Sequence, residues 1–256
     1  VITMSTVYHL DLDKKKIRGA KIALLPGDPF RSQIIAEKIS ETYKTKNEKL
    51  AWKREFCTYL AEIKGKKLLI TSTGIGGPST SIAIDELAQL GIDTFIRVGT
   101  TGAIQDYINI GDVIITSGSV RLDGASTHYA PIEYPAVAHY EALNALVEGA
   151  KKVKVRYHVG ITASSDTFYP GEERKDSFSK YVLRRFQGAT KEWQKLHVLN
   201  YEMESSTVLT LTSSMGLKGG CITGVVNKIG MEKITKESLK AGQENAIRAA
   251  IAAVKY

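Results

Sequence analysis

Residues 21–31, KIALLPGDPFR, contain the clearest indication of the fold class of this protein. The first six residues of this stretch are mostly apolar and have the length of a buried strand. Gly27-Asp28-Pro29 follows as a turn, and a helix is predicted to begin at Phe30. A strand, a glycine-containing loop and a helix in this order are typical of α/β proteins.

The same order of strand, loop and helix recurs along the rest of the chain. The predicted strands are Lys21–Pro26, Lys67–Ser72, Thr94–Val98, Asp112–Ser117, His158–Ala163 and Gly220–Val226. The predicted helices are Phe30–Ser40, Ser79–Leu90, Tyr140–Lys151, Ser205–Met215 and Glu237–Val254. Short apolar strands that alternate with longer amphipathic helices predict an α/β fold with a largely parallel sheet.

The chain is predicted to form one domain over residues 1–256. This length is within reach of a single large α/β domain, and no internal repeat, low-complexity segment or Pro/Ser-rich linker divides it. The segment Glu41–Lys53 is polar and rich in lysine, so it could be a mobile surface excursion, although such a charge run is usually just a solvated face.

Composition excludes several classes of protein. Hydrophobic residues make up 43% and charged residues 24%, which argues against disorder, collagen or a coiled coil for the chain as a whole. The 35 Lys and Arg residues outnumber the 27 Asp and Glu residues, and the net charge is +8. A positive field of this size suits nucleic acid, a membrane surface or a small phosphate-bearing substrate, without choosing among them.

The protein is expected to be located in a reducing compartment. Cys57 and Cys221 are far apart and form no C-x-x-C, which rules out a zinc ribbon and argues against a disulfide framework. No apolar core precedes Lys14, as a secretory signal would require, and no apolar run is long enough to span a bilayer. We therefore expect a cytoplasmic protein without a membrane partner.

Several well-known catalytic motifs are missing. The G-x-G that begins at Gly74 is not completed, because Ser79 occupies the third glycine position, and this disfavours a dinucleotide site. The sequence contains neither a P-loop nor a G-x-S-x-G nucleophile elbow. The five histidines show no metal-ligand spacing.

Four predicted strands end in loops of glycine and small polar residues. In open α/β sheets, ligands bind beyond the carboxyl ends of the strands, and glycine lets the backbone present N–H groups to an anion. Each loop taken singly is also explained as a simple turn. The loops are Gly27-Asp28-Pro29, Gly74-Ile75-Gly76-Gly77, Gly99-Thr100-Thr101-Gly102 and Ser164-Ser165-Asp166.

Charged residues accompany these loops. Arg31 lies at the start of the first predicted helix, and Arg97 lies inside an apolar strand, where a guanidinium needs either an anionic ligand or a structural ion pair. Glu202 and Glu204 flank Met203 where another helix begins. These two carboxylates could hold a polyol, or they could form the acidic first turn of the helix.

Taken together, these stretches resemble the bacterial uridine phosphorylases of the nucleoside phosphorylase superfamily. No single stretch is specific, but they run in the family's order from about Val7 to the C-terminus. The matching stretches are Pro26–Pro29, Ser72–Ser79, Arg97–Ala103, Val120–Ser126, Thr162–Gly171 and Asn200–Ser205. The resemblance implies a three-layer α/β/α domain with a twisted, partly closed mixed sheet, assembled as a hexamer that is a trimer of dimers.

The reaction implied by the resemblance is reversible phosphorolysis, in which uridine and phosphate give uracil and ribose 1-phosphate. Phosphate is the co-substrate, no cofactor is required, and no nucleic acid takes part. Arginine suits phosphate because it forms bidentate hydrogen bonds. The positions that match the family's phosphate site are Gly27, Arg31, Arg97 and Thr100, with Arg54 contributed by the dimer partner.

The remaining family sites also match by position. The ribose site falls on Met203, Glu204 and Thr100, with His9 from the partner; Glu204 would bind the 2′- and 3′-hydroxyls and Glu202 would support it. The base site falls on Thr101, Gly102, Phe168 and Arg174. Arg174 would face uracil O4, where negative charge grows as the glycosidic bond breaks, so the implied catalytic residues are Arg97, Glu204 and Arg174. A structural K⁺ at the dimer interface is implied at Glu55, the carbonyl of Ile75, and Ser79.

Two positions depart from the family pattern. The family's base-reading Gln is Glu172 here, and its Asn-Arg near the last strand is Asn227-Lys228. A Gln amide both donates and accepts hydrogen bonds, whereas an ionised Glu only accepts, and Lys lacks the planar fork of Arg. Both changes affect recognition of the base, and neither affects binding of phosphate or ribose.

Three other functions stay open. A purine nucleoside phosphorylase is one, because Glu172 could accept from a purine N1–H, although purine members place an Asp where this sequence has Asn227. A nucleosidase that uses water would leave the phosphate-site arginines without a purpose. A nucleic-acid-binding protein could use the +8 charge, but the aromatic residues are not interleaved with basic ones as a stacking platform requires.

Overall fold

The six predicted strands and the five predicted helices are all confirmed by the computed structural model, which describes residues 6–229 and 233–256. The ten strands within these residues are β1 (Ile22–Leu25), β2 (Glu48–Lys53), β3 (Phe56–Ile63), β4 (Lys66–Thr71), β5 (Thr94–Ala103), β6 (Val113–Leu122), β7 (Ala136–Val137), β8 (Tyr157–Ser165), β9 (Asn200–Glu202) and β10 (Lys218–Lys228). The α-helices are α1 (Pro29–Tyr43), α2 (Gly77–Leu90), α3 (Tyr140–Lys152), α4 (Ala189–Lys195), α5 (Ser205–Ser214) and α6 (Lys236–Ala253).

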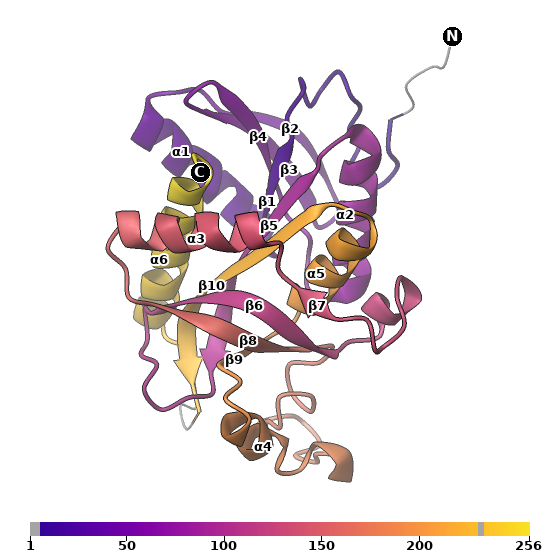
Figure 1. Cartoon of the computed structure of the whole chain (residues 1–256), viewed down its shortest axis with the longest axis vertical. Coiled ribbons are helices and arrows are strands. Elements are labelled where there is room, and N and C mark those ends of the chain that lie inside the picture. The colour runs from indigo at the N-terminus through magenta and orange to yellow at the C-terminus, as the bar shows by residue number, and fades with distance from the viewer. Residues whose placement is uncertain (1–5, 230–232) are drawn as a thin grey trace.

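All ten strands belong to one mixed sheet, which is partly closed. Its order is β10-β6-β8-β9-β5-β1-β4-β3-β2, and β7 pairs with β6. Because β10 also pairs with β5, the strands β10, β6, β8, β9 and β5 form a closed ring (Figure 1). Strands β4, β1, β5 and β10 run parallel to their neighbours in that series. The expected twisted, partly closed sheet is therefore confirmed.

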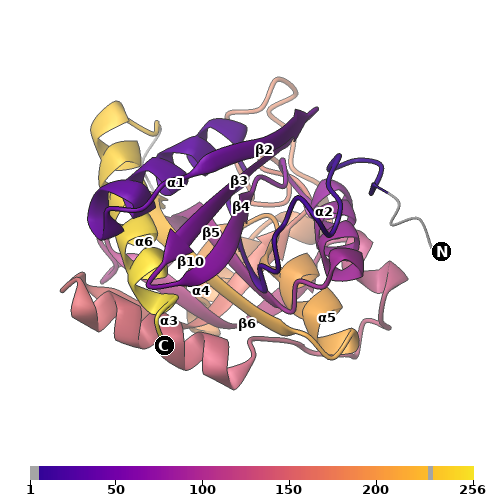
Figure 2. The same ribbon diagram turned by 90° about the horizontal axis from the view of Figure 1, so that it is seen from above.

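Helices cover both faces of the sheet and complete three layers. On one face, α1, α3 and α6 bury Ile39, Leu146 and Ile247 in a single apolar cluster. On the other face, α2 and α5 bury Leu87 and Leu211 in a second cluster. Figure 2 shows the two helix groups on opposite sides of the strands. None of the helices within residues 6–229 and 233–256 is long and apolar enough to cross a membrane.

The expectation for the segment Glu41–Lys53 is partly wrong. Its first residues complete α1, but Glu48–Lys53 forms β2, which pairs with β3 at the edge of the sheet. The side chains of β2 are exposed or half-buried, as suits a charged edge strand that discourages further strand pairing. The segment is therefore solvated but also regular, because its partner strand satisfies its backbone groups.

The parallel strands bring the predicted loops to one edge of the sheet. Since β1, β4 and β5 point the same way, their carboxyl ends place Gly27, Gly74 and Thr100 side by side. The fourth loop behaves differently. Ser164 accepts a hydrogen bond from the Ser206 N–H at 3.1 Å, and Asp166 accepts from the Gly124 N–H at 2.8 Å, so this loop braces its neighbours.

Candidate active site

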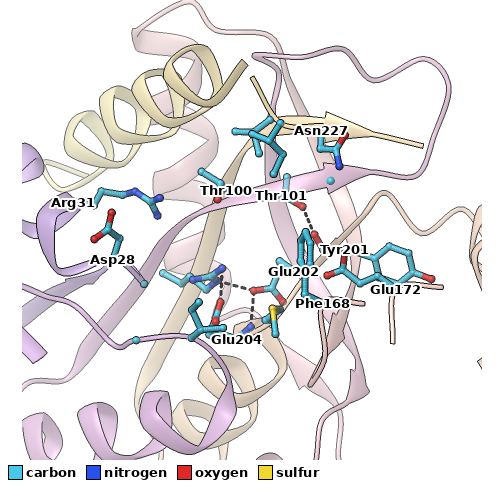
Figure 3. A pocket seen from close by; sticks show the side chains of 18 of the residues that line it. Asp28, Arg31, Thr100, Thr101, Phe168, Glu172, Tyr201, Glu202, Glu204 and Asn227 are labelled. Carbon is cyan, nitrogen blue, oxygen red and sulfur yellow. Dashed lines mark hydrogen bonds and ion pairs between the residues drawn. The ribbon is translucent and has the colours of Figure 1, made fainter. Parts of the chain in front are cut away.

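A cavity of about 610 Å³ opens at this edge, where β9 and the start of α5 meet the ends of β1, β4 and β5. Twelve of the predicted site residues line it: Gly27, Arg31, Glu55, Ile75, Arg97, Thr100, Thr101, Gly102, Phe168, Glu172, Met203 and Glu204. The lining also includes Asp28, Pro29, Gly74, Tyr201, Glu202, Val226, Asn227 and Ile234. The chain thus gathers residues from both halves of the sequence around one hollow (Figure 3).

Arg97 joins the two carboxylates of the site. From β5 its Nε donates to Glu202 Oε2 at 2.7 Å, and its Nη2 lies 2.6 Å from Glu204 Oε2. The guanidinium lies flat against Gly99, where a Cβ atom would sit only 2.6 Å from Nη2. Arg97 is 5% exposed and still lines the cavity. Arg97 therefore forms a structural ion pair and also faces the space where a ligand would bind. Both roles considered from the sequence, ion pairing and contact with an anion, are compatible with this environment.

Glu202 and Glu204 differ in their surroundings. Burial disfavours ionised Glu202, but Arg97 and the hydrogen bonds from Ser205 and from the Glu204 N–H lower its pKa. Burial raises the pKa of Glu204; Arg97 opposes this rise and the charge of Glu202 adds to it. Glu204 also accepts from the Gly76 N–H at 2.6 Å. Glu202 thus anchors the start of α5, and Glu204 lies between Arg97 and the loop after β4.

Arg31 supplies a second guanidinium. Asp28 caps α1 by accepting from the Phe30 N–H at 2.9 Å, and Pro29 fixes the first helical residue, so Arg31 lies in the first turn. Its residue is 9% exposed. Burial lowers the pKa of Arg31, and the nearby positive charge of Arg97 lowers it further. Two guanidinium groups at one cavity favour a dianionic ligand.

The opposite part of the cavity is aromatic and contains a desolvated carboxyl group. Phe168 and Tyr201 lie beside Glu172 in Figure 3. Burial raises the pKa of Glu172 to about 8; Arg174 opposes the rise, and Glu202 and Glu204 add to it. Within the described residues, no hydrogen bond is formed by the Glu172 carboxyl group. A planar, polar heterocycle would fit such surroundings.

Arg174 does not line the cavity. Its Nε and Nη2 donate to the two carboxylate oxygens of Asp176, at 3.0 and 2.7 Å. The guanidinium carbon lies 4.5 Å from the centre of the Phe168 ring. In this structure Arg174 therefore stacks behind the aromatic wall, and its expected contact with uracil O4 stays a prediction.

Thr101 lines the cavity with its hydroxyl group already engaged. The hydroxyl donates to the Tyr201 carbonyl at 2.5 Å and accepts from Asn200 Nδ2 at 2.7 Å. These two hydrogen bonds connect β5 to β9 and hold the backbone of Tyr201 in place beside Thr101. Thr100, Gly102 and the half-buried Met203 line the cavity as predicted.

His9 and Arg54 lie outside the cavity of their own chain. His9 Nδ1 lies 2.7 Å from Glu86 Oε1, and Arg54 is exposed in the tight turn between β2 and β3. Their expected contribution to a neighbouring subunit stays a prediction.

The three predicted cation ligands are brought together around Gly74. A Cβ atom at Gly74 would lie 2.9 Å from Glu55 Cγ and 3.2 Å from Ser79 Oγ, and the Ser79 hydroxyl is 3.3 Å from the Ile75 carbonyl. Carboxylate, hydroxyl and carbonyl oxygens are the donors that hard cations prefer. Among the described residues, no three His, Cys, Asp or Glu side chains group as a metal site.

Of the two departures from the family pattern, one lies at the cavity and one does not. Glu172 lines the cavity, as does Asn227, but Lys228 turns away and donates to the Asp106 carbonyl at 2.9 Å. Sequence reasoning gave no role to Tyr201, although it stands inside the predicted Asn200–Ser205 stretch. The match of Asn200–Ser205 to the family pattern is the sequence feature that could have identified Tyr201 as a site residue.

The paired arginines of this cavity suit a phosphate group, the acidic pair suits a polyol, and the aromatic wall suits a planar base. The chain belongs to the Phosphorylase superfamily, whose sequence profile matches residues 21–256. It is 52% identical to a uridine phosphorylase of Escherichia coli strain K12 over 99% of both chains. It is 51% identical to one of Haemophilus influenzae over 98% of both chains, and 46% identical to one of Thermococcus kodakarensis over 97% of this chain and 85% of that protein.

Proposed function

We propose that this protein catalyses the reversible phosphorolysis of uridine to uracil and ribose 1-phosphate, as a pentosyltransferase of pyrimidine nucleoside salvage. The observation that carries the proposal is the convergence of Arg31 and Arg97 on a cavity that also contains Glu204 and an aromatic wall. The relatives of 46–52% identity are uridine phosphorylases, which favours the pyrimidine reaction. Residues 1–256 act as one domain, since one sheet includes strands from Ile22 to Lys228.

Different residues of the cavity bind the phosphate, the ribose and the base. Arg31 and Arg97 bind phosphate beneath C1′ of the nucleoside, with Gly27 and Thr100 beside them. Glu204 accepts hydrogen bonds from the ribose hydroxyls and fixes the sugar while positive charge develops at C1′. Phosphate then attacks C1′, the bond from C1′ to N1 breaks, and its electrons pass to the uracil ring, whose anion takes up a proton from solvent to give uracil. The role of the base site is to stabilise that charge.

Phosphate dependence tests this function. The protein is incubated with uridine, thymidine and inosine, each with and without phosphate, and the products are identified. We expect uracil and ribose 1-phosphate from uridine only when phosphate is present. Release of base and free ribose at equal rates without phosphate would show a nucleosidase and contradict the proposal.

The purine alternative is weaker. The last strand brings Asn227 to the cavity, and an amide is a poorer proton donor to purine N7 than an Asp. The one Asp in the lining, Asp28, is engaged as the cap of α1. Turnover of inosine in the same assay, in preference to uridine, would reverse this choice.

We also propose that the active unit is a dimer within a hexamer. Large apolar side chains are exposed beside the cavity: Ile75 is 76% exposed and lines it, and Phe30 packs edge-on against the exposed Trp52. Tyr8 and Arg54 stand on the neighbouring loops. Such a patch next to an active site favours an interface with a second copy, which would bring Arg54 and His9 into the partner's cavity. Glu55, Ile75 and Ser79 would then hold K⁺ near that interface.

Subunit mixing tests the shared site. Mixed oligomers of Arg54→Ala and Arg97→Ala subunits are expected to recover on the order of a quarter of the native activity, since half of randomly formed dimers are mixed and each has one complete site. Oligomers mixed from Arg31→Ala and Arg97→Ala subunits are the control, because both residues serve their own chain and no complete site forms. Equal activity in the two mixtures would contradict sharing.

The proposed location is the cytoplasm. Cys57 and Cys221 are both buried free thiols in the described structure, as is usual for proteins of reducing compartments.

A further inference from the structure

Arg31 and Arg97 are held in different ways. Arg97 is bound by two carboxylates, whose negative charges offset its own. Arg31 instead donates from Nε to the amide oxygen Oε1 of Gln243 on α6, at 2.9 Å. Within the described residues, this is the one hydrogen bond of the Arg31 side chain, and no carboxylate lies within ion-pair distance of it. Its terminal nitrogens are therefore left for a ligand.

The position of Gln243 follows from an unusually close approach of α6 to the sheet. A Cβ atom at Gly224 on β10 would lie 1.8 Å from the Gly242 carbonyl oxygen. A Cβ atom at Gly242 would lie 2.7 Å from the Val225 carbonyl oxygen. Only two glycines facing each other allow this contact, and the contact fixes the position of α6 along β10. The next residue on the helix is Gln243, and it reaches Arg31 across 212 positions of sequence.

A neutral amide suits this task better than a carboxylate would. An arginine side chain has five N–H donors, and the Nε bond to Gln243 uses one and fixes the plane of the other four. Because the amide carries no net charge, the full positive charge of Arg31 stays available to an incoming anion. Figure 3 shows the guanidinium end of Arg31 pointing toward Thr100. A carboxylate in place of Gln243 would compete with phosphate for the guanidinium.

We propose that Gln243 is a positioning residue for phosphate: it orients the Arg31 guanidinium toward the cavity without neutralising it. The inference rests on the proposed phosphorolysis, since it assigns phosphate as the anion. The inference concerns phosphate and not the nucleoside, because Gln243 does not line the cavity and acts only through Arg31. A defect at Gln243 should therefore change phosphate affinity and leave the nucleoside's KM unchanged.

Three variants separate positioning from structure. Gln243→Met keeps the length of the side chain and removes the acceptor, and it should raise the KM for phosphate about tenfold with kcat within about twofold. Gln243→Glu keeps the acceptor and adds a charge, and it should raise that KM further. Asn245→Leu is the matched control, because Asn245 is an amide on the same helix that donates to the Gly111 carbonyl at 2.8 Å, away from the cavity. It should leave both KM values unchanged.

Calorimetric titration with inorganic phosphate alone gives a readout that does not depend on turnover. The native protein should bind phosphate about tenfold more tightly than Gln243→Met. An unchanged phosphate affinity in Gln243→Met, or an equal rise in the KM for uridine, would overturn the inference and leave phosphorolysis standing. Phosphate binding without any turnover of uridine would sink the proposed function, while the ranking of the variants would still decide the role of Gln243. Absence of phosphate binding by the native protein would overturn both.

Discussion

Arg97→Ala is expected to lower kcat/KM for phosphate by about a thousandfold or more, which corresponds to about 4 kcal/mol of transition-state stabilisation. The variant removes the guanidinium that faces the ligand space and leaves Glu202 and Glu204 as neighbouring carboxylates with no cation between them. Loss of one partner of a buried ion pair also lowers the free energy of unfolding by about 3–5 kcal/mol. Steady-state kinetics at saturating uridine measure the loss of kcat/KM, and denaturant unfolding followed by circular dichroism measures the loss of unfolding free energy.

Two companion variants separate catalysis from stability. Arg97→Lys keeps the charge but loses the planar fork, so it should retain more activity than Arg97→Ala. Arg121→Ala is the structural control: Arg121 bonds to the backbone carbonyls of Pro131, Tyr134 and Ala130, and it does not line the cavity. We expect it to lower stability while kcat/KM stays near the native value. Equal losses in the two Arg97 variants would show that Arg97 serves only as an ion pair.

Glu172→Gln is expected to remove a decline in uridine turnover that the native protein shows at alkaline pH. Burial raises the pKa of Glu172 to about 8. Below that pH the carboxyl group is protonated and can donate to uracil O2 as an amide does; above it the group is ionised, and its charge opposes the negative charge of the departing base. The native kcat/KM for uridine should therefore fall about tenfold between pH 7 and pH 9.

The variant should show no such decline. Its advantage over the native protein should be small at pH 6.5, about tenfold at pH 9, and at most about a hundredfold once Glu172 is fully ionised. Ionisation of uridine itself is common to both proteins, so the ratio of the two rates at each pH isolates Glu172. Glu173→Gln is the adjacent control, because Glu173 accepts from the Thr190 N–H at 2.9 Å and does not line the cavity. It should keep the native pH profile.

The same variant also tests the identity of the base. If Glu172→Gln leaves uridine turnover unchanged and abolishes turnover of inosine or guanosine, Glu172 reads a purine N1–H. That result would favour the purine alternative over the proposed function.

Regular elements were predictable where local composition is decisive. The apolar runs that became β1, β5 and β10 are bounded by glycine and polar residues, and each is buried in the sheet. Strand β3 was missed although almost all of it is buried, because Phe56–Ile63 mixes apolar residues with Thr and Glu in no clear period. Strand β9 has three residues and exists because β5 and β8 supply its hydrogen-bond partners.

The candidate site was predictable as a set of residues but not as a geometry. Motif order placed Arg31, Arg97 and Glu204 in one site, and the structure brings all three to one cavity. The same order placed Arg174 beside the base, yet in the structure it pairs with Asp176 behind Phe168. A motif fixes which residue types are present, whereas the direction of a long side chain depends on charges that its own loop presents.

Local sequence is enough to predict the alternation of strands and helices, the glycine-containing loops at the strand ends, and the residue types of the phosphate and ribose positions. These follow from local periodicity and from the chemistry of single side chains. Four features depend on the folded chain and could not be predicted: the closure of the ring by β10 against β5, the pairing of Arg97 with Glu202 across 105 positions, the desolvation of Glu172, and the contact between Gln243 and Arg31. They could not be predicted because burial and hydrogen-bond partners are supplied by segments remote in the chain, and their effects on charge and orientation exist only once those segments are packed together.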